Sequence, residues 1–417
     1  MTRLLKYFTS QITTQVLTFM AGVLVIRSMG KREYAVYAVS IGVVAAITAL
    51  AESGSNAVLL RVGSTRMVNG IAPWDIFLQA IKFRIKFGAL FVAIGLIFLG
   101  FLLTANQATL IESCVVISIV IASFFPIFTN SILIIFHRLH LRTELLQYTS
   151  VFIALLRVVA IGLLLIQNLN SPVAMVVLNL LLLSFSIFAL SRGLPFTYRT
   201  ENKDAVLVSE LRSTTLRVLP MTLMMIVGEQ VFVALLSLRG GPEVVAEASA
   251  LTKFGIAFLV VNSWVSDWAS PRLALLRDSR AKIALWMLRI LLGQIVISAA
   301  FVGGVYLFRD TLLSLLGEQY ATLTEALVLF AVGSSLFYLG YSWDLLNQAR
   351  GWVKGSWLFA PMVISWFLVV WFWFPIGNAT DAAWVYMLLS IPMLLAQCFR
   401  SLSGFRRLPH ENGRALG

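Results

Sequence analysis

The sequence has few charged residues for its length. Asp, Glu, Lys and Arg make up 12% of its 417 residues, whereas a soluble globular domain usually carries about 25%. Hydrophobic residues make up 59% of the chain. A chain of this composition cannot cover its surface with polar groups. We therefore exclude a soluble globular protein and predict an all-α polytopic membrane protein.

Cysteine and histidine are also scarce. The two cysteines, Cys114 and Cys398, lie far apart inside apolar runs, so we expect neither a disulfide framework nor a site of paired thiolates. His137, His140 and His410 form no metal-ligand pattern with acidic partners. There is no HExxH motif, no Walker-type glycine loop and no acidic pair of the kind that lipid-sugar glycosyltransferases carry in an external loop. We therefore expect neither an enzyme nor a resident cofactor or metal.

Long apolar runs occupy most of the chain. A helix needs about 20 apolar residues to cross a hydrocarbon layer of roughly 30 Å. About twelve runs meet this requirement: Phe8 to Ile26, Tyr34 to Ala51, Phe87 to Thr104, Ser113 to Phe136, Tyr148 to Ile166, Val173 to Leu190, Leu216 to Leu238, Ala248 to Trp268, Ile283 to Phe308, Leu323 to Leu345, Trp357 to Phe374, and Ala382 to Arg400. The connections are too short to hold a folded soluble domain.

Positive charge is distributed unequally between the two sets of connections. The set that includes both termini carries roughly 23 Lys and Arg against roughly 5 in the other set, which predicts that both termini are cytoplasmic. The Lys and Arg residues that set the orientation of the chain in the membrane thus account for its net charge of +13. We therefore do not expect nucleic-acid binding. Arg3 and Lys6 precede the first run as in a signal peptide, but no small-residue cleavage site follows. We expect that run to be retained as the first span.

Ionisable residues also lie inside or at the edges of the apolar runs. They are the cations Arg157, Arg217, Lys253 and Arg289 and the acids Glu52, Glu229, Asp267 and Asp344. An ionised side chain at the bilayer centre costs about 2.5 to 3.5 kcal/mol, so such residues usually face a watery cavity or a partner. Arg217 and Arg289 lie near cytoplasmic ends, where snorkelling to the headgroups is the alternative. A structural ion pair, such as Glu229 with Lys253, would give the same pattern.

Uncharged polar residues accompany some of these charges on one helical face. In the first run the three- and four-residue spacing aligns Gln11, Thr14, Gln15 and Thr18. In the fifth run, Ser150, Arg157 and Asn168 share a face, and in the eighth run Lys253, Trp264 and Asp267 share another. Such stripes are expected where a span borders a polar cavity.

A weak internal repeat divides the chain into two halves. The segment "GKREYAVYAVS" begins at Gly30 and "GPEVVAEASAL" begins at Gly241, each directly after an odd-numbered span. Two six-span halves related in this way are usual in secondary transporters, whose substrate site lies between them near the midplane. We predict an N-terminal six-helix bundle over 1–191, a cytoplasmic linker over 192–215, a C-terminal six-helix bundle over 216–402 and a cytoplasmic tail over 403–417.

Three segments resemble a known family. The stretch "RSMGKREYAVYAVSIGVVAAITALAESGSNAVLLR" resembles the first helical pair of bacterial polysaccharide-unit flippases, the Wzx-like O-antigen and exopolysaccharide branch of the MATE-like MOP superfamily. "LPMTLMMIVGEQVFVALLSLRGGPEVVAEAS" is similar to that family's seventh span, and "LLSLLGEQYATLTEALVLFAVG" to its short external helix and tenth span. The chain departs from the family at Ala35 and Val36, where Gly-Leu is usual, and at Ala246, Glu247 and Ala248.

The resemblance implies a flippase of the bacterial inner membrane. Such proteins move a glycan on undecaprenyl diphosphate to the periplasmic leaflet by alternating access, and a gradient of H⁺ or Na⁺ is the candidate driving force. Polymerase and assembly proteins of the pathway are the expected partners, besides the lipid-linked oligosaccharide and membrane lipids. Arg157 and Lys253, with Arg27 and either Arg217 or Arg289, would contact the diphosphate. The candidates for ion coupling are Glu229 first and Asp267 second, followed by Glu52 and Asp344.

Two other classes of function compete with this interpretation. A MATE-like exporter of small cationic molecules would need an acid-dominated cavity, whereas the deep charges here are balanced or slightly basic. A membrane glycosyltransferase or polymerase would need a sizeable external loop with catalytic residues. A lipid II flippase of the same superfamily would be expected to have two further C-terminal spans.

Overall fold

The computed structural model describes residues 2–56, 58–59, 73–139, 143–192, 205–276, 280–352 and 356–407. Nearly all of these residues are helical, and none of them lies in a strand. Contacts group the chain into an N-terminal unit, Met1–Ala246, and a C-terminal unit, Glu247–Gly417. The predicted all-α polytopic fold is confirmed.

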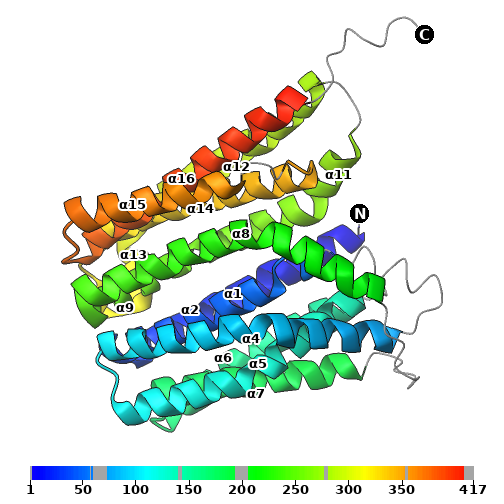
Figure 1. Cartoon of the computed structure of the whole chain (residues 1–417). Helices are drawn as coiled ribbons and strands as arrows, with labels where there is room; N and C mark the ends of the chain where they lie inside the picture. Colours follow the sequence, from blue (N-terminus) through cyan, green and yellow to red (C-terminus); the bar gives the residue numbers. More distant parts are fainter. Residues whose placement is uncertain are drawn as a thin grey trace, which may run out of the picture. The chain divides into compact units, whose positions relative to one another are not determined.

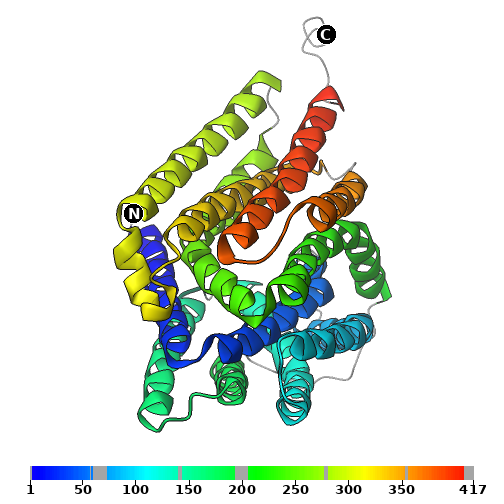
Figure 2. The same ribbon diagram turned by 90° about the vertical axis from the view of Figure 1, so that its left-hand side faces the viewer.

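The N-terminal unit is a helical bundle. Figure 1 shows its helices lying alongside one another, and the turned view in Figure 2 shows that they form a bundle rather than a flat layer. Its helices are α1 (Thr2–Ser28), α2 (Lys31–Glu52), α4 (Pro73–Ala105), α5 (Leu110–Leu139), α6 (Thr143–Ile166), α7 (Pro172–Ser191), α8 (Ala205–Leu235) and the π-helical turn η1 (Leu236–Gly240). The extensive packing pairs are α1 with α6, α2 with α4 and α5 with α7, and α8 packs on α2.

The C-terminal unit is built around α14 and α16. α9 (Gly241–Leu251) leads into it across the boundary between the units. Its other elements are η2 (Thr252–Ile256), α10 (Ala257–Trp264), η3 (Val265–Ala269), α11 (Ser270–Leu275), α12 (Arg280–Leu307), α13 (Arg309–Leu316), η4 (Glu318–Tyr320), α14 (Thr324–Ala349), η5 (Ser356–Leu358), α15 (Phe359–Trp373) and α16 (Ala379–Arg407). α14 packs along α16 and on α12.

The helix starts follow local chemistry. Pro172 opens α7, and the hydroxyl of Ser171 before it accepts a hydrogen bond from the Ala174 amide at 3.2 Å. The Gly30 amide ahead of α2 donates to the Glu33 carboxylate at 3.2 Å, which satisfies one of the free donors of the first turn. These helix starts lie within a few residues of the predicted ones.

Ten helical stretches among the described residues are long and apolar enough to cross a membrane. One of them, Val206–Trp264, has 59 residues, which is roughly 90 Å of helix and too long for one crossing. It is broken at Gly241, whose φ of 72° and ψ of −175° favour glycine. Counting this stretch as two crossings and adding the shorter α15 accounts for the twelve predicted spans.

The eighth span is not one regular helix. Between α9 and α11 the chain changes from α-helix to the 3₁₀ turn η2, back to α-helix in α10, and then to the π-helical turn η3. Non-α turns inside a helix often mark functional or strained positions. Lys253 lies on η2 and Asp267 on η3, so both predicted residues of this span fall on its irregular turns.

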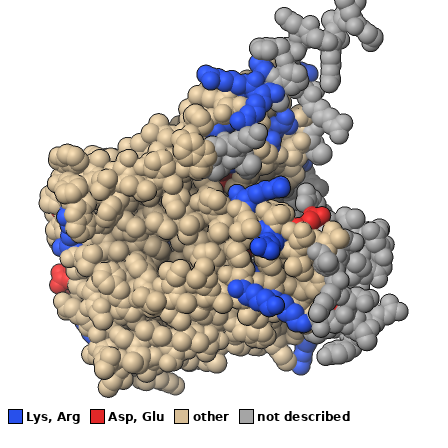
Figure 3. Space-filling view, in the orientation of Figure 1, with Lys and Arg blue, Asp and Glu red and all other residues tan. Residues whose placement is uncertain are grey.

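Part of the surface carries no charged side chains. Figure 3 shows Lys and Arg near the helix ends and a wide uncharged region between them on the face that it presents. Large apolar side chains such as Ile97 and Val296 are exposed in this part of the helices, at 78% and 68%. An uncharged apolar band is the surface expected against lipid hydrocarbon.

A close contact between α2 and α4 gives the first prediction. A methyl group added at Gly95 of α4 would meet the side chain of Ile47, with its Cγ1 at 2.5 Å, and Ile47 is buried. We expect Gly95→Ala to destabilise the protein by about 1 to 3 kcal/mol through overpacking, measured as a lowered midpoint of unfolding in detergent.

The control for Gly95→Ala lies five residues further along the same helix. At Gly100 an added methyl group meets only Ile117 Cδ1, at 3.9 Å. Gly100→Ala should therefore leave the midpoint unchanged or raise it, because alanine favours helix. Equal midpoints for the two variants would contradict a tight α2–α4 contact at Gly95.

Candidate functional site

Arg157 lies between two cavities inside the N-terminal unit. It projects from α6, is half-buried, and its Nε atom is buried without a hydrogen-bond partner. The cavities have volumes of about 230 Å³ and about 290 Å³, and Arg157, Asn130 and Ser186 line both of them. The Ser186 hydroxyl donates to Asn130 Oδ1 at 2.8 Å, so α5 and α7 are tied together beside the guanidinium. We call these spaces the Arg157 cavities.

The first Arg157 cavity is bordered by α1. Thr14 and Thr18, two members of the predicted polar stripe, line it together with Thr149 and Ser150 of α6. The hydroxyls of Thr14 and Thr18 donate to carbonyl oxygens one turn earlier in α1, at 2.9 Å and 2.7 Å. Their oxygens remain able to accept a further hydrogen bond. The predicted stripe on the first span and the predicted Ser150–Arg157 face therefore border the same cavity.

The second Arg157 cavity is bordered by α2, α5 and α7. Asn179 of α7 lines it, and its Nδ2 donates to the Met175 carbonyl at 3.0 Å and to the Tyr37 hydroxyl at 3.4 Å. Ser123 of α5 supplies another hydroxyl. Among the described residues that line the two cavities, Arg157 is the one charged side chain. The rest of the lining is aliphatic, and a guanidinium with neutral hydroxyl and amide groups near it is suited to an anion with several oxygens, such as a phosphate.

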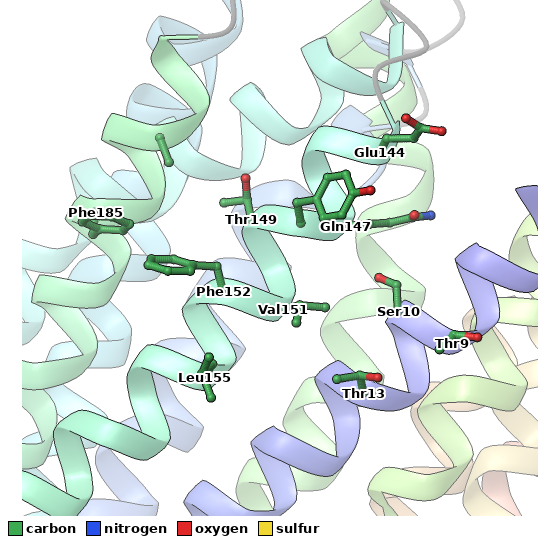
Figure 4. Close-up of a pocket in the computed structure, with 12 residues that line it drawn as sticks. Thr9, Ser10, Thr13, Glu144, Gln147, Thr149, Val151, Phe152, Leu155 and Phe185 are labelled. Carbon is green, nitrogen blue, oxygen red and sulfur yellow. The ribbon is translucent and has the colours of Figure 1, made fainter.

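An open groove adjoins the first Arg157 cavity. It has a volume of about 840 Å³ and lies between α1, α6 and α7, and Thr149 lines both spaces. Figure 4 shows the hydroxyls of Thr9, Ser10 and Thr13 on one side and the ring of Phe152 on the other. We call this space the α1–α6–α7 groove. Hydroxyl groups of α1 lie opposite the apolar side chains of α6 and α7, and the first turns of α6 add the polar side chains of Glu144, Gln147 and Thr149.

The other predicted cations do not line the Arg157 cavities. Arg27 is exposed in the last turn of α1, and Arg217 is exposed on α8. Lys253 is exposed on η2. Arg289 is exposed on α12 and lines a separate cavity of the C-terminal unit. The roles predicted for these four residues stay predictions.

The predicted acidic residues fall into two groups. Glu229 is exposed on α8, and Asp267 lies on η3 with its side chain outside the described part. Glu52 and Asp344 both have arginine partners: Glu52 lies 3.6 Å from Arg84, and Asp344 pairs with Arg400. The ion-coupling roles of all four acids stay predictions, but the carboxylates of Glu52 and Asp344 each also pair with an arginine.

Arg84 was assigned to a connection by the sequence, with the third span starting at Phe87, and this is wrong. α4 already begins at Pro73, and Arg84 is 0% exposed. Its guanidinium donates to Ser55 Oγ at 3.2 Å and also contacts Asn56 Oδ1 and Ser131 Oγ. The overlooked signal was Pro73 followed by Asp75, because proline and an acidic residue favour the first turn of a helix.

Arg400 is likewise buried rather than at a membrane surface, with 1% of its surface exposed. α16 continues past it to Arg407. Its Nε donates to the Trp352 carbonyl at 2.9 Å and its Nη1 to Gln397 Oε1 at 3.0 Å and to Asp344. Gln348 Nε2 donates to the other Asp344 oxygen at 2.6 Å. The buried pair therefore has its polar atoms largely satisfied, which is the condition for tolerating buried charge.

The Arg84 cluster supports a test on stability. Ser131→Ala removes one hydroxyl that accepts from the buried guanidinium, and we expect a loss of about 1.5 to 3 kcal/mol because the bond is charge-assisted. Ser118→Ala is the matched control on the same helix, since that exposed hydroxyl bonds only to the Cys114 carbonyl, at 2.8 Å. Both are measured as unfolding midpoints in detergent, and equal midpoints would contradict the assigned role of Ser131.

The described ranges contain no candidate metal site. There, no group of three or more His, Cys, Asp or Glu side chains lies close enough together to hold a metal ion. Cys114 is exposed, Cys398 is half-buried, and both are free thiols.

Comparison with known proteins identifies the fold. No protein-family model matches the sequence, and no curated protein matches it significantly. An inward-facing multidrug resistance MATE family transporter of the MOP superfamily has a similar structure, with a TM-score of 0.73, 16% identity and 94% of each chain covered. Its outward-facing form gives a TM-score of 0.66 at 15% identity, covering 96% of this chain and 95% of that one.

A lipid II flippase, MurJ, in an inward closed conformation is also similar. It gives a TM-score of 0.67 at 11% identity, covering 96% of this chain and 89% of that one. Identities this low show a shared fold. The chain therefore has the fold of these MATE transporters and of the lipid II flippase MurJ.

Proposed function

We propose that this protein is a flippase of the bacterial inner membrane. Its substrate is an oligosaccharide repeat unit linked to undecaprenyl diphosphate, which it moves to the periplasmic leaflet for surface polysaccharide synthesis. The observation that carries the proposal is the position of Arg157: its Nε has no hydrogen-bond partner among the described residues, and its cavities offer hydroxyl and amide groups and adjoin the α1–α6–α7 groove. This arrangement fits an anionic head attached to a long apolar chain. The likeness in fold to a lipid II flippase supports it.

The chemistry of the N-terminal unit assigns a role to each part of such a substrate. The diphosphate binds Arg157, because a guanidinium donates several parallel hydrogen bonds to phosphate oxygens. The hydroxyl and amide groups of the Arg157 cavities hydrogen-bond to the phosphate or the nearest sugar. The isoprenoid chain lies against Phe152 and its apolar neighbours in the α1–α6–α7 groove. The groups that contact the diphosphate thus lie beside Arg157, and the apolar side chains that contact the isoprenoid lie in the adjoining groove, in the order that the substrate requires.

Other predicted residues complete the proposal. Arg27, Arg217 and Lys253 are further candidates for phosphate contact, whereas Arg289 lines a separate cavity whose other side chains point to a different ligand. Glu229 and Asp267 are the candidates for coupling to H⁺ or Na⁺, by titration or by binding the cation.

Both termini are cytoplasmic in this proposal, and a C-terminal reporter that is active only in the cytoplasm tests the orientation. Polymerase and assembly proteins are the proposed partners.

Export of small cations is the principal alternative. A cationic substrate requires carboxylates to compensate its charge, and no carboxylate is among the described residues that line the Arg157 cavities. Glu144 lines only the outer groove. The charge of the cavity therefore favours the anionic substrate. A glycosyltransferase or polymerase is the second alternative, and it would alter the glycan rather than move it.

Reconstitution in liposomes tests the proposed function. A fluorescent label is placed on the glycan of undecaprenyl-diphosphate oligosaccharide, and dithionite, which does not cross the bilayer, quenches only the label in the outer leaflet. The protein should raise the quenched fraction above one half, while labelled phosphatidylcholine in the same liposomes stays at one half. Movement of a small cationic dye without movement of the labelled glycan would contradict the proposal and favour the exporter.

A further inference from the structure

The C-terminal unit has a cavity of its own with an unusual lining. It has a volume of about 330 Å³ and is bordered by α10, η3 and α12. Its lining residues are Val261, Trp264, Val265, Trp268, Trp286, Arg289, Ile290, Gly293, Gln294 and Ile297. Three indoles, one guanidinium and one amide therefore surround a space of the size that a headgroup or small ligand occupies. We call it the tryptophan cavity.

Gln294 gives this cavity an unsatisfied acceptor. Its side chain is 2% exposed, and its Nε2 donates to the Tyr338 carbonyl at 3.0 Å. A carbonyl can only accept, so this bond sets which end of the amide is nitrogen. The remaining atom, Oε1, is buried and has no hydrogen-bond partner. A buried acceptor left unpaired costs free energy, so the site is completed by a ligand that carries an O–H or N–H donor.

Arg289 gives the cavity a positive charge that the protein does not neutralise. Within the part of the chain that the structure describes, no hydrogen bond or ion pair engages its guanidinium. It lies nine residues after the start of α12, which is roughly 14 Å along the helix, and its neighbours Leu288 and Leu292 are 51% and 50% exposed. This face of α12 thus borders lipid. A cation in that position is stabilised by an anion that comes from the bilayer itself.

The indoles define the shape of the space between these two groups. Trp264 and Trp268 stack, with ring centroids 5.0 Å apart and ring planes at 17°. Arg272 lies over the Trp268 ring, 4.1 Å from its centroid, which adds a second positive charge beside the cavity. Indole rings suit the membrane interface because they combine an apolar face with an N–H donor. They provide apolar walls for the carbon atoms of a headgroup that ends in polar groups.

We infer that the tryptophan cavity binds the phosphoglycerol headgroup of an anionic membrane lipid. The lipid phosphate pairs with Arg289, and a glycerol hydroxyl donates to Gln294 Oε1. The glycerol carbons lie against the indoles, and the acyl chains follow the exposed apolar face of α12. A choline headgroup lacks the donor that Gln294 needs and brings a cation towards Arg289 and Arg272. The site stands whether or not the protein moves a lipid-linked glycan, because it uses none of the residues of the Arg157 cavities.

Native mass spectrometry of the purified full-length protein tests this inference. The protein is titrated with phosphatidylglycerol, phosphatidic acid, phosphatidylethanolamine or phosphatidylcholine, and retained lipid is counted. We expect one phosphatidylglycerol to be retained at concentrations where the other three are not. Arg289→Ala should weaken this binding about tenfold, because a charge-assisted bond to phosphate is lost. Arg407→Ala, which removes an exposed charge at the end of α16, is the matched control and should bind as the unaltered protein does.

A second variant separates the hydroxyl from the charge. Phosphatidic acid has the phosphate but no glycerol hydroxyl, so Gln294→Leu should abolish the preference for phosphatidylglycerol over phosphatidic acid while retaining the preference for both over phosphatidylcholine. If Gln294→Leu does not fold, Arg289→Ala decides the matter, since Arg289 is exposed and makes no hydrogen bond or ion pair with the described residues. Unchanged retention by Arg289→Ala would overturn the inference. So would equal retention of phosphatidylethanolamine or phosphatidylcholine by the unaltered protein.

Discussion

Replacing Arg157 by alanine should nearly abolish translocation of the lipid-linked glycan without destabilising the protein. One charge-assisted bond to a phosphate contributes about 1.5 to 3 kcal/mol, so loss of this guanidinium lowers the rate at limiting substrate by about ten- to a hundredfold or more. Stability should be unchanged or higher, because the variant removes a buried Nε that has no partner. The liposome assay gives the rate, and thermal unfolding in detergent gives the stability.

Two further variants make the Arg157 result specific. Arg157→Lys keeps the positive charge but loses the forked donor geometry, so its rate should lie between those of the unaltered protein and Arg157→Ala. Arg138→Ala removes an exposed cation from α5 and should leave the rate within twofold of the unaltered value. An Arg157→Ala protein that translocates normally would refute the assignment of the diphosphate to this residue. A strongly destabilised Arg157→Ala protein would instead assign Arg157 to the structure of the bundle.

The second large effect is expected at the buried pair of the C-terminal unit. Asp344 is 2% exposed and Arg400 is 1% exposed, so Asp344→Ala leaves a guanidinium buried without its counter-charge. Removing one partner of such a pair usually costs about 3 to 5 kcal/mol, and we expect a correspondingly large fall in the unfolding midpoint. Arg407→Ala removes an exposed charge from α16, the helix of Arg400, and should have little effect.

The double variant Asp344→Leu with Arg400→Met distinguishes a structural role from ion coupling. It removes both charges, so stability should recover by several kcal/mol relative to Asp344→Ala. Recovery of stability together with normal gradient-driven transport would assign the pair to structure alone. If instead Asp344→Asn is as stable as the unaltered protein but has lost its dependence on H⁺ or Na⁺, Asp344 is the coupling residue and the structural assignment is wrong.

Much of the candidate site was visible in the sequence because it lies on single helices. Thr14 and Thr18 are one helical turn apart, and Ser150 and Arg157 are two turns apart, so each pair shares a face whatever the rest of the chain does. The structure places both faces on one cavity. Asn130 and Ser186 were not predicted as members, because neither forms a stripe on its own helix and they meet only where α5 packs against α7.

The arginines show why hydropathy alone misplaces some charges. Arg84 precedes the third predicted span and Arg400 is the last residue of the twelfth, so both were counted among the positive charges of the cytoplasmic side. In the structure they are buried because acceptors from other segments surround them: Ser131 of α5 for Arg84, and Asp344 of α14 for Arg400. A window of consecutive residues cannot detect partners that lie dozens of residues away. Without these two arginines, the connections on the side of the termini still carry many more Lys and Arg than the opposite connections.

The sequence by itself determined that this protein is a helical membrane protein with about twelve spans. In the hydrocarbon region the backbone N–H and C=O groups of a single spanning segment must hydrogen-bond to each other. An apolar run of sufficient length therefore forms a helix. Only the tertiary structure decided which polar side chains meet. The rotation of each helix about its axis depends on close packing against helices remote in sequence, as at Gly95 against Ile47. That rotation gives Arg84 and Arg400 buried partners and places Arg157 at the Arg157 cavities, where its Nε has no hydrogen-bond partner among the described residues.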